Sequence, residues 1–175
     1  LQVHHRNDWD LDETRYIRII TRKTASLCGA CCLLGATFAG ASQDWVGQLE
    51  RYGLLLGTAF QIQDDILDLA GDVRDVGKTL GTDIEKGKMT LPMIQFMRTA
   101  PPEHRELLRW LLESGEPDKA DKIRNLILPG DSIQYAQARA QEYADRACQA
   151  LCALPDTQAR QMLKEMAEFA VTRTT

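Results

Sequence analysis

Apolar residues recur every three or four positions along almost the whole chain, which is the spacing of one face of an α-helix. The first such stretch carries apolar side chains at Tyr16, Ile17, Ile20, Leu27, Cys31 and Leu34. Valine, isoleucine and threonine never form the alternating runs that are typical of strands. The pattern therefore predicts an all-α chain.

Capping residues, glycines and prolines divide this pattern into successive helices. Asp10 or Asp12 can cap the first helix, Gly40 can end it, and Ser42 can cap the next one. The other predicted features are a helix from about Gln43 to about Leu69, a polar loop from Gly71 to Met89, helix starts at Thr90–Pro92 and Pro101–Pro102, breaks at Pro117 and Pro129–Gly130, a long helix from about Asp131 to Leu154 and a last helix from about Thr157 to Val171.

The predicted helix that begins near Gln43 carries an unusual stripe. Gly53 and Gly57 stand in its middle, where each glycine costs roughly 1 kcal/mol relative to alanine. Continued along the same face, the stripe reads Gly53, Gly57, Gln61, Asp64 and Asp68. Two explanations are equally open: close packing against a neighbouring helix, or an open channel in which an apolar chain lies under a charged head group.

Three carboxylates and a glutamine lie near the end of the same helix. Gln61, Asp64, Asp65 and Asp68 share one face, because side chains three and four residues apart meet on a helix. Close carboxylates repel each other unless a cation lies between them, and Mg²⁺ prefers oxygen ligands and bridges to phosphates. Asp64 and Asp68 are the best-placed pair, and Asp65, rotated by one residue, can ligate through water. The alternative is a solvated acidic face, which the apolar neighbours disfavour.

Two segments can supply positive charge for a phosphate. The loop from Gly77 to Pro92 combines glycines, which let the backbone approach a ligand, with lysines, which act as mobile point charges. Lys23 precedes Thr24 on a helix that is becoming apolar, so that Lys23 either snorkels or contacts a phosphate. For any single lysine the alternative is a solvated side chain, and Lys86 fits that alternative best.

Composition argues against several other classes of protein. The net charge of −4 and the lack of a basic patch argue against a nucleic-acid binder. We expect no apolar run long enough to span a bilayer and no secretory signal. The five cysteines are predicted to be small buried hydrophobes and not zinc ligands or a disulfide framework, which fits a reducing cytoplasmic compartment.

Taken together, these segments resemble the trans-type polyprenyl diphosphate synthases. Lys23–Thr24–Ala25 is similar to the family's KTA motif. The segment from Phe60 to Asp68 resembles FQxxDDxLD, the second aspartate-rich motif, and the segment from Gly77 to Pro92 resembles GKxxGxDxxxxKxTLP. The resemblance covers the whole chain, most strongly from about Tyr16 to Met97, and the tail is similar to long-chain members such as octaprenyl diphosphate synthase.

The resemblance implies that residues 1–175 are the C-terminal part of a single all-α domain, a helical bundle of the isoprenoid synthase type with a central cavity. It implies a Mg²⁺-dependent 1′–4 head-to-tail condensation of isopentenyl diphosphate with an allylic diphosphate, in a homodimer. The residue roles that it implies are catalysis by Lys23, Thr24, Gln61 and Lys78, substrate binding by Lys23, Gln61, Lys78 and Lys88, and magnesium binding by Asp64, Asp65 and Asp68.

The family's first aspartate-rich motif, DDxxD followed by arginines, has no counterpart in this chain. We therefore expect that the N-terminal half is missing, that the isolated chain is inactive, and that it exposes apolar surface where the lost helices would pack. The alternatives are a short-chain farnesyl or geranylgeranyl synthase, a non-catalytic regulatory subunit of a hetero-oligomeric synthase, a class I terpene cyclase, and a helical interaction module with a solvated acidic stripe.

Overall fold

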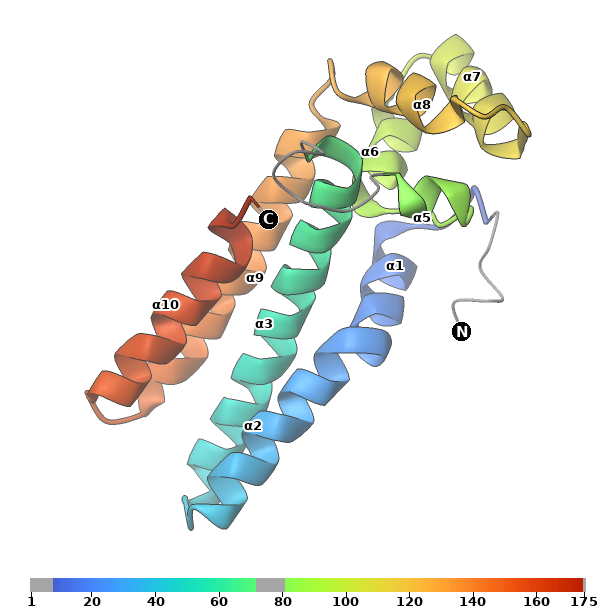
Figure 1. Cartoon of the computed structure of the whole chain (residues 1–175). Coiled ribbons are helices and arrows are strands. Elements are labelled where there is room, and N and C mark those ends of the chain that lie inside the picture. The colour runs from blue at the N-terminus through green and yellow to red at the C-terminus, as the bar shows by residue number, and fades with distance from the viewer. Residues whose placement is uncertain (1–7, 72–80, 175) are drawn as a thin grey trace. The chain divides into compact units, whose positions relative to one another are not determined.

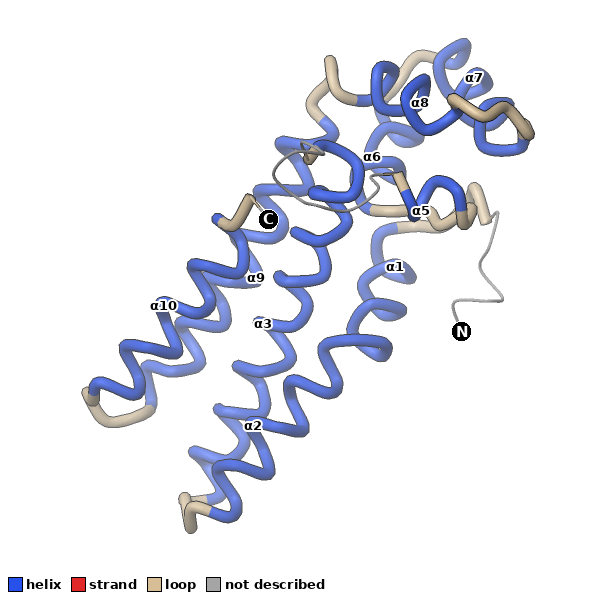
Figure 2. The backbone as a smooth tube through the Cα atoms, viewed as in Figure 1, coloured by secondary structure: helices blue, strands red, loops and turns tan. Residues whose placement is uncertain are grey.

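The computed structural model describes residues 8–71 and 81–174, and this part of the chain contains helices and their connections but no strand (Figures 1 and 2). The all-α prediction is confirmed. The chain divides into two compact units: unit 1 comprises Leu1–Tyr16, Asp64–Gln137 and Thr174–Thr175, and unit 2 comprises Ile17–Gln63 and Ala138–Arg173. That residues 1–175 belong to a single domain stays a prediction.

Where the sequence predicted helix boundaries, the observed ones agree to within a few residues, but two of the described helices have no predicted counterpart; one of them, α8 (Lys119–Ile127), lies between the predicted breaks at Pro117 and Pro129–Gly130. The other, the short helix α5, lies inside the segment that was predicted to be a polar loop, so that prediction is wrong there. The elements in chain order are α1 (Glu13–Ile20), the π-helical turn η2 (Thr21–Ala25), α2 (Ser26–Phe38), α3 (Gln43–Ala70), α5 (Thr82–Glu85), α6 (Leu91–Thr99), α7 (Pro102–Glu113), α8 (Lys119–Ile127), α9 (Ser132–Ala150), the 3₁₀ turn η3 (Leu151–Ala153) and α10 (Gln158–Thr172).

The caps explain why the local predictions succeed. The Asp12 carboxylate accepts a hydrogen bond from the Arg15 backbone N–H at 2.8 Å, and the Ser42 hydroxyl accepts one from the Trp45 N–H at 3.4 Å. Gly40 follows α2 with a φ of 73°, a left-handed conformation that glycine adopts without strain. Each of these capping residues acts on groups only a few residues away, so its role can be predicted from the sequence alone.

In unit 2, the glycine stripe brings α3 directly against η2 and α2. A Cβ atom on Gly53 would lie 2.5 Å from the carbonyl oxygen of Cys28, and one on Gly57 would lie 2.6 Å from the α-carbon of Ala25. Close helix packing, the first of the two explanations for the stripe, is therefore confirmed. An open channel is wrong at these two positions, because the backbone of the neighbouring helix fills the space.

The core of unit 2 joins α3 to α9, η3 and α10. Tyr52 of α3 is 1% exposed and lies in a cluster with Leu55, Ala147, Leu151 and Ala167, among others. Its hydroxyl donates a hydrogen bond to the carbonyl oxygen of Leu163 in α10 at 2.7 Å. Burial raises the pKa of the Tyr52 phenol well above its usual value of 10.

Two expectations, one about the burial of the cysteines and one about the length of apolar runs, are wrong. All five cysteines are free, but none is buried: Cys31 and Cys152 are exposed and the other three are half-buried. The continuous helical stretch Glu13–Phe38 is also long and apolar enough, by length and composition, to cross a membrane. A single helix of this kind is weak evidence for a membrane span, because the core helix of a soluble protein can be equally long and apolar; 28% of its most apolar window is buried.

The expected exposed apolar surface is present on α2. Leu27 is 69% exposed, Leu34 is 50% exposed and Phe38 is 87% exposed. These side chains are spaced by seven and four residues, so they follow one side of the helix. This side lies away from Gly29, whose added Cβ would meet the Leu54 side chain of α3 at 2.8 Å.

Candidate functional site

The three aspartates of the predicted site lie in the last turns of α3 and belong to unit 1. Asp64 and Asp68 are half-buried, whereas Asp65 is 1% exposed. A fully solvated acidic face is therefore wrong at Asp65. Burying a carboxylate is costly unless it is paired and hydrogen-bonded, so the partners of Asp65 decide what this turn of the helix can do.

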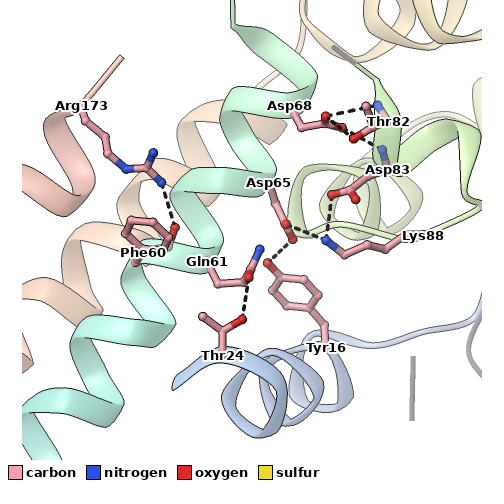
Figure 3. Close-up of polar contacts among 10 residues, drawn as sticks. All are labelled: Tyr16, Thr24, Phe60, Gln61, Asp65, Asp68, Thr82, Asp83, Lys88 and Arg173. Atoms are coloured by element: carbon pink, nitrogen blue, oxygen red, sulfur yellow. Dashed lines mark hydrogen bonds and ion pairs between the residues drawn. The ribbon is translucent and has the colours of Figure 1, made fainter. Parts of the chain in front are cut away.

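Asp65 has a separate donor for each carboxylate oxygen (Figure 3). The hydroxyl of Tyr16 in α1 donates to Oδ2 at 2.7 Å, and the ammonium of Lys88 donates to Oδ1 at 2.8 Å. Lys88 Nζ also pairs with Asp83 Oδ2 at 2.8 Å. One lysine thus bridges two carboxylates, while a neutral phenol completes the set.

The burial of this cluster, which comprises Tyr16, Asp65, Asp83 and Lys88, shifts the pKa values of its members. Burial raises the pKa of Asp65, and the charge of Lys88 opposes that rise. Burial alone would lower the pKa of Lys88, but the charges of Asp65 and Asp83 outweigh it and raise the pKa. Burial and then the charge of Asp65 raise the pKa of Tyr16 well above 10, so that the phenol stays a neutral donor.

Asp68 acts as the cap of α5. Its Oδ1 accepts hydrogen bonds from the Thr82 backbone N–H at 3.2 Å and the Thr82 hydroxyl at 2.9 Å, and its Oδ2 accepts one from the Asp83 N–H at 3.0 Å. The backbone carbonyl of Asp68 also accepts from the Gly81 N–H at 2.9 Å. A carboxylate is a good hydrogen-bond acceptor for the first backbone N–H groups of a helix, and here that carboxylate lies fourteen residues before Thr82 in the sequence.

Helix α8 holds the chain on either side of residues 72–80. The Arg124 guanidinium donates to the carbonyl oxygen of Gly71 at 3.0 Å, just after α3. Gly81 has a φ of 76°, and a Cβ there would lie 2.8 Å from the Cβ of Ala120 in α8. Lys78, predicted to be catalytic and substrate-binding, lies outside the described residues.

In unit 2, the π-helical turn η2 carries the lysine and threonine of the predicted site. The Thr24 hydroxyl donates to Gln61 Oε1 at 2.8 Å, and Gln61 is 7% exposed. Lys23 is exposed. Nothing in the sequence indicated the π-helical geometry, which is rare and frequently marks functional sites.

The structure therefore brings two pairs of predicted residues together: Asp65 with Lys88 in unit 1, and Thr24 with Gln61 in unit 2. Lys86 is exposed, as expected for a solvated lysine. That Lys88 binds a substrate stays a prediction, since its ammonium contacts two carboxylates here. Sequence reasoning missed Tyr16, which it treated as an apolar core position; a buried tyrosine needs a partner for its hydroxyl, and that need was the available signal.

The carboxylates fit a magnesium ion that is completed by phosphate oxygens. In residues 8–71 and 81–174 there is no group of three or more His, Cys, Asp or Glu side chains that could hold a metal ion. Asp64 and Asp68 lie one helical turn apart and are partly exposed, and an oxygen of Asp68 that bound a cation would have to share it with the hydrogen bonds from Thr82 and Asp83. Mg²⁺ is usually bound by one or two carboxylates together with waters and substrate phosphates, so this donor set suits it.

Comparisons with known proteins place this chain in a family. A family model described as polyprenyl synthetase matches residues 1–127. The octaprenyl diphosphate synthase of Escherichia coli is 37% identical over 174 residues, which are 99% of this chain and 54% of that protein. The short chain isoprenyl diphosphate synthase of Methanothermobacter thermautotrophicus is 35% identical over 164 residues, which are 94% of this chain and 50% of that protein.

Comparison with a solved structure supports the same family. The polyprenyl synthase from Caulobacter crescentus CB15, crystallised with calcium and isoprenyl diphosphate, matches with a TM-score of 0.91 and 34% identity, over 99% of this chain and 54% of that one. The chain spans about half the length of the curated relatives it matches. Because the family model matches most of this chain, the chain belongs to the polyprenyl synthetase family.

Proposed function

We propose that this chain supplies the allylic-diphosphate and magnesium side of a prenyltransferase that condenses isopentenyl diphosphate with an allylic diphosphate. The observation that carries the proposal is the end of α3, where the partly exposed Asp64 and Asp68 flank a buried, fully hydrogen-bonded Asp65. Such an arrangement concentrates carboxylates where a divalent cation and a diphosphate would share them. The relatives named above are synthases of prenyl diphosphates, which supports the same chemistry.

In this proposal Asp64 and Asp68, supported by Asp65, hold Mg²⁺. Bound magnesium would supply the positive charge that stabilises a departing diphosphate. Lys23 and Lys78 would contribute ammonium groups to the same diphosphate, and such charges accelerate the reaction because the negative charge grows in the transition state.

Thr24 and Gln61 would orient each other through their 2.8 Å hydrogen bond, beside the carbon that becomes cationic. Their polar atoms would present oriented dipoles where bulk water has to be excluded, because water would quench a carbocation. Lys88 would keep the segment that follows α5 in place through Asp65 and Asp83.

We further propose a long-chain product and a homodimer on the strength of the family resemblance, and a cytoplasmic location, which the free cysteines fit. A short-chain product is the main alternative, since long-chain and short-chain synthases are 37% and 35% identical to this chain. A non-catalytic subunit is less well supported, because a purely structural subunit gains little from keeping Asp64, Asp65 and Asp68 together.

The proposal is tested by a condensation assay on two proteins: this chain alone, and this chain joined to the N-terminal half of the Escherichia coli octaprenyl diphosphate synthase. We expect no turnover by the chain alone and Mg²⁺-dependent formation of prenyl diphosphates by the fusion, with the product length read by mass spectrometry. Asp64→Asn should abolish turnover, while Asp44→Asn, an exposed aspartate in the first turn of the same helix, should not. A folded but inactive fusion would refute the proposal, and turnover by the chain alone would refute its expected inactivity.

A further inference from the structure

Tyr16 lies outside all three sequence motifs, yet it contacts the centre of one of them. It belongs to α1, is 2% exposed and donates a hydrogen bond to Asp65 Oδ2 at 2.7 Å across 49 residues of sequence. A hydrogen bond to a charged acceptor is stronger than one between neutral groups. The contact therefore fixes α1 and the last turns of α3 to each other within unit 1.

The other side of Asp65 is held as well. Lys88 Nζ lies 2.8 Å from Oδ1 and is itself held by Asp83 at 2.8 Å. With a donor on each oxygen, the Asp65 carboxylate can turn only if it breaks one of these contacts. Asp64 and Asp68 lie on the same turns of α3, so the contacts of Asp65 hold the backbone from which both side chains extend, while the Asp68 carboxylate is also held by the backbone N–H groups of α5.

We infer that Tyr16 is a positioning residue for magnesium diphosphate: it acts through Asp65 on the aspartate-rich turn and does not touch the metal or the substrate. This inference rests on the proposed function. It also separates Tyr16 from the residues of the KTA and aspartate-rich motifs, which would meet the ligand directly. Outer partners that orient metal-binding carboxylates typically change metal affinity by about 10- to 100-fold when they are removed.

The test is the affinity of the chain for inorganic diphosphate in the presence of Mg²⁺, measured by calorimetry. We expect Tyr16→Phe, which removes only the hydroxyl, to weaken binding about 10-fold or more. Tyr52→Phe is the matched control, because Tyr52 is equally buried and also donates one hydrogen bond at 2.7 Å, to a backbone carbonyl in unit 2. It should lower stability in the same way and leave the affinity unchanged.

A double variant checks that Tyr16 acts through Asp65. If it does, Tyr16→Phe combined with Asp65→Asn should bind no more weakly than Asp65→Asn alone, because the two changes break one shared interaction. Equal affinities of Tyr16→Phe and Tyr52→Phe, or fully additive losses in the double variant, would overturn the inference while leaving the proposed function intact. Absence of any Mg²⁺-dependent binding by the unaltered chain would instead count against the proposed function and overturn the inference with it.

Discussion

The contact between α3 and α2 can be probed by adding one methyl group to the glycine stripe. In Gly53→Ala, the new Cβ would lie 2.5 Å from the carbonyl oxygen and 2.8 Å from the carbonyl carbon of Cys28. Both are backbone atoms of a helix, so the strain cannot be relieved by moving a flexible side chain. Gly47→Ala is the matched control in the same helix, because among the described residues nothing lies within 4 Å of its added Cβ.

The size of the effect follows from two opposing contributions. Alanine favours a helix over glycine by about 1 kcal/mol, and this gain is the same at both positions. Overpacking of a tight contact costs about 1–3 kcal/mol, and a backbone obstacle places Gly53→Ala near the upper end of that range. We therefore expect Gly47→Ala to stabilise the fold by up to about 1 kcal/mol and Gly53→Ala to destabilise it by about 1–2 kcal/mol.

Urea unfolding followed by far-ultraviolet circular dichroism measures both free energies, and the difference between the two variants isolates the packing cost because the helix propensity cancels. The denaturant dependence should stay unchanged, since neither variant alters the surface exposed on unfolding. If Gly53→Ala proved as stable as Gly47→Ala, the close approach of α3 to α2 would be refuted. The open-channel interpretation of the stripe would then return.

Three further predictions concern other parts of the chain. The free energy of unfolding should fall as the pH rises above about 10, by about 1.4 kcal/mol per pH unit for each buried phenol, because burial raises the pKa of Tyr52 in the folded state and the unfolded state ionises first. Tyr52→Phe should lessen this slope in urea titrations at several pH values; an unchanged slope would contradict the assignment. Thr24→Val keeps the shape of the side chain but removes the donor to Gln61, so we expect a loss of about 1–3 kcal/mol in unfolding free energy, and a neutral result would speak against the hydrogen bond. Phe38→Ser should change the free energy of unfolding by less than about 0.5 kcal/mol, since Phe38 is 87% exposed, but it should reduce self-association in sedimentation experiments. Unaltered association would show that the exposed apolar side of α2 does not mediate it.

Most helix boundaries can be predicted because their capping residues lie within a few positions in the sequence. A contact between residues far apart in the chain leaves no such pattern in the sequence. Asp12 and Ser42 cap helices through backbone N–H groups three residues away, so their roles can be predicted from spacing. Helix α5 escapes prediction because its N-terminus is capped by Asp68, fourteen residues upstream. The exposure of Cys31 depends on how much of α2 its neighbours cover, which periodicity does not reveal.

The spacing of the aspartates themselves explains why they do not behave as three equal ligands. Neighbouring residues on an α-helix point about 100° apart, whereas residues four apart point in nearly the same direction. Asp64 and Asp68 therefore point most nearly the same way, and Asp65 lies at the edge of their face of α3, where Tyr16 and Lys88 contact it. In the proposed function, two adjacent carboxylates and a third one turn later would thus provide a buried anchor, Asp65, and two carboxylates for a cation, Asp64 and Asp68. The buried anchor makes the turn rigid, and a rigid turn holds two like charges at the spacing that a divalent cation can bridge.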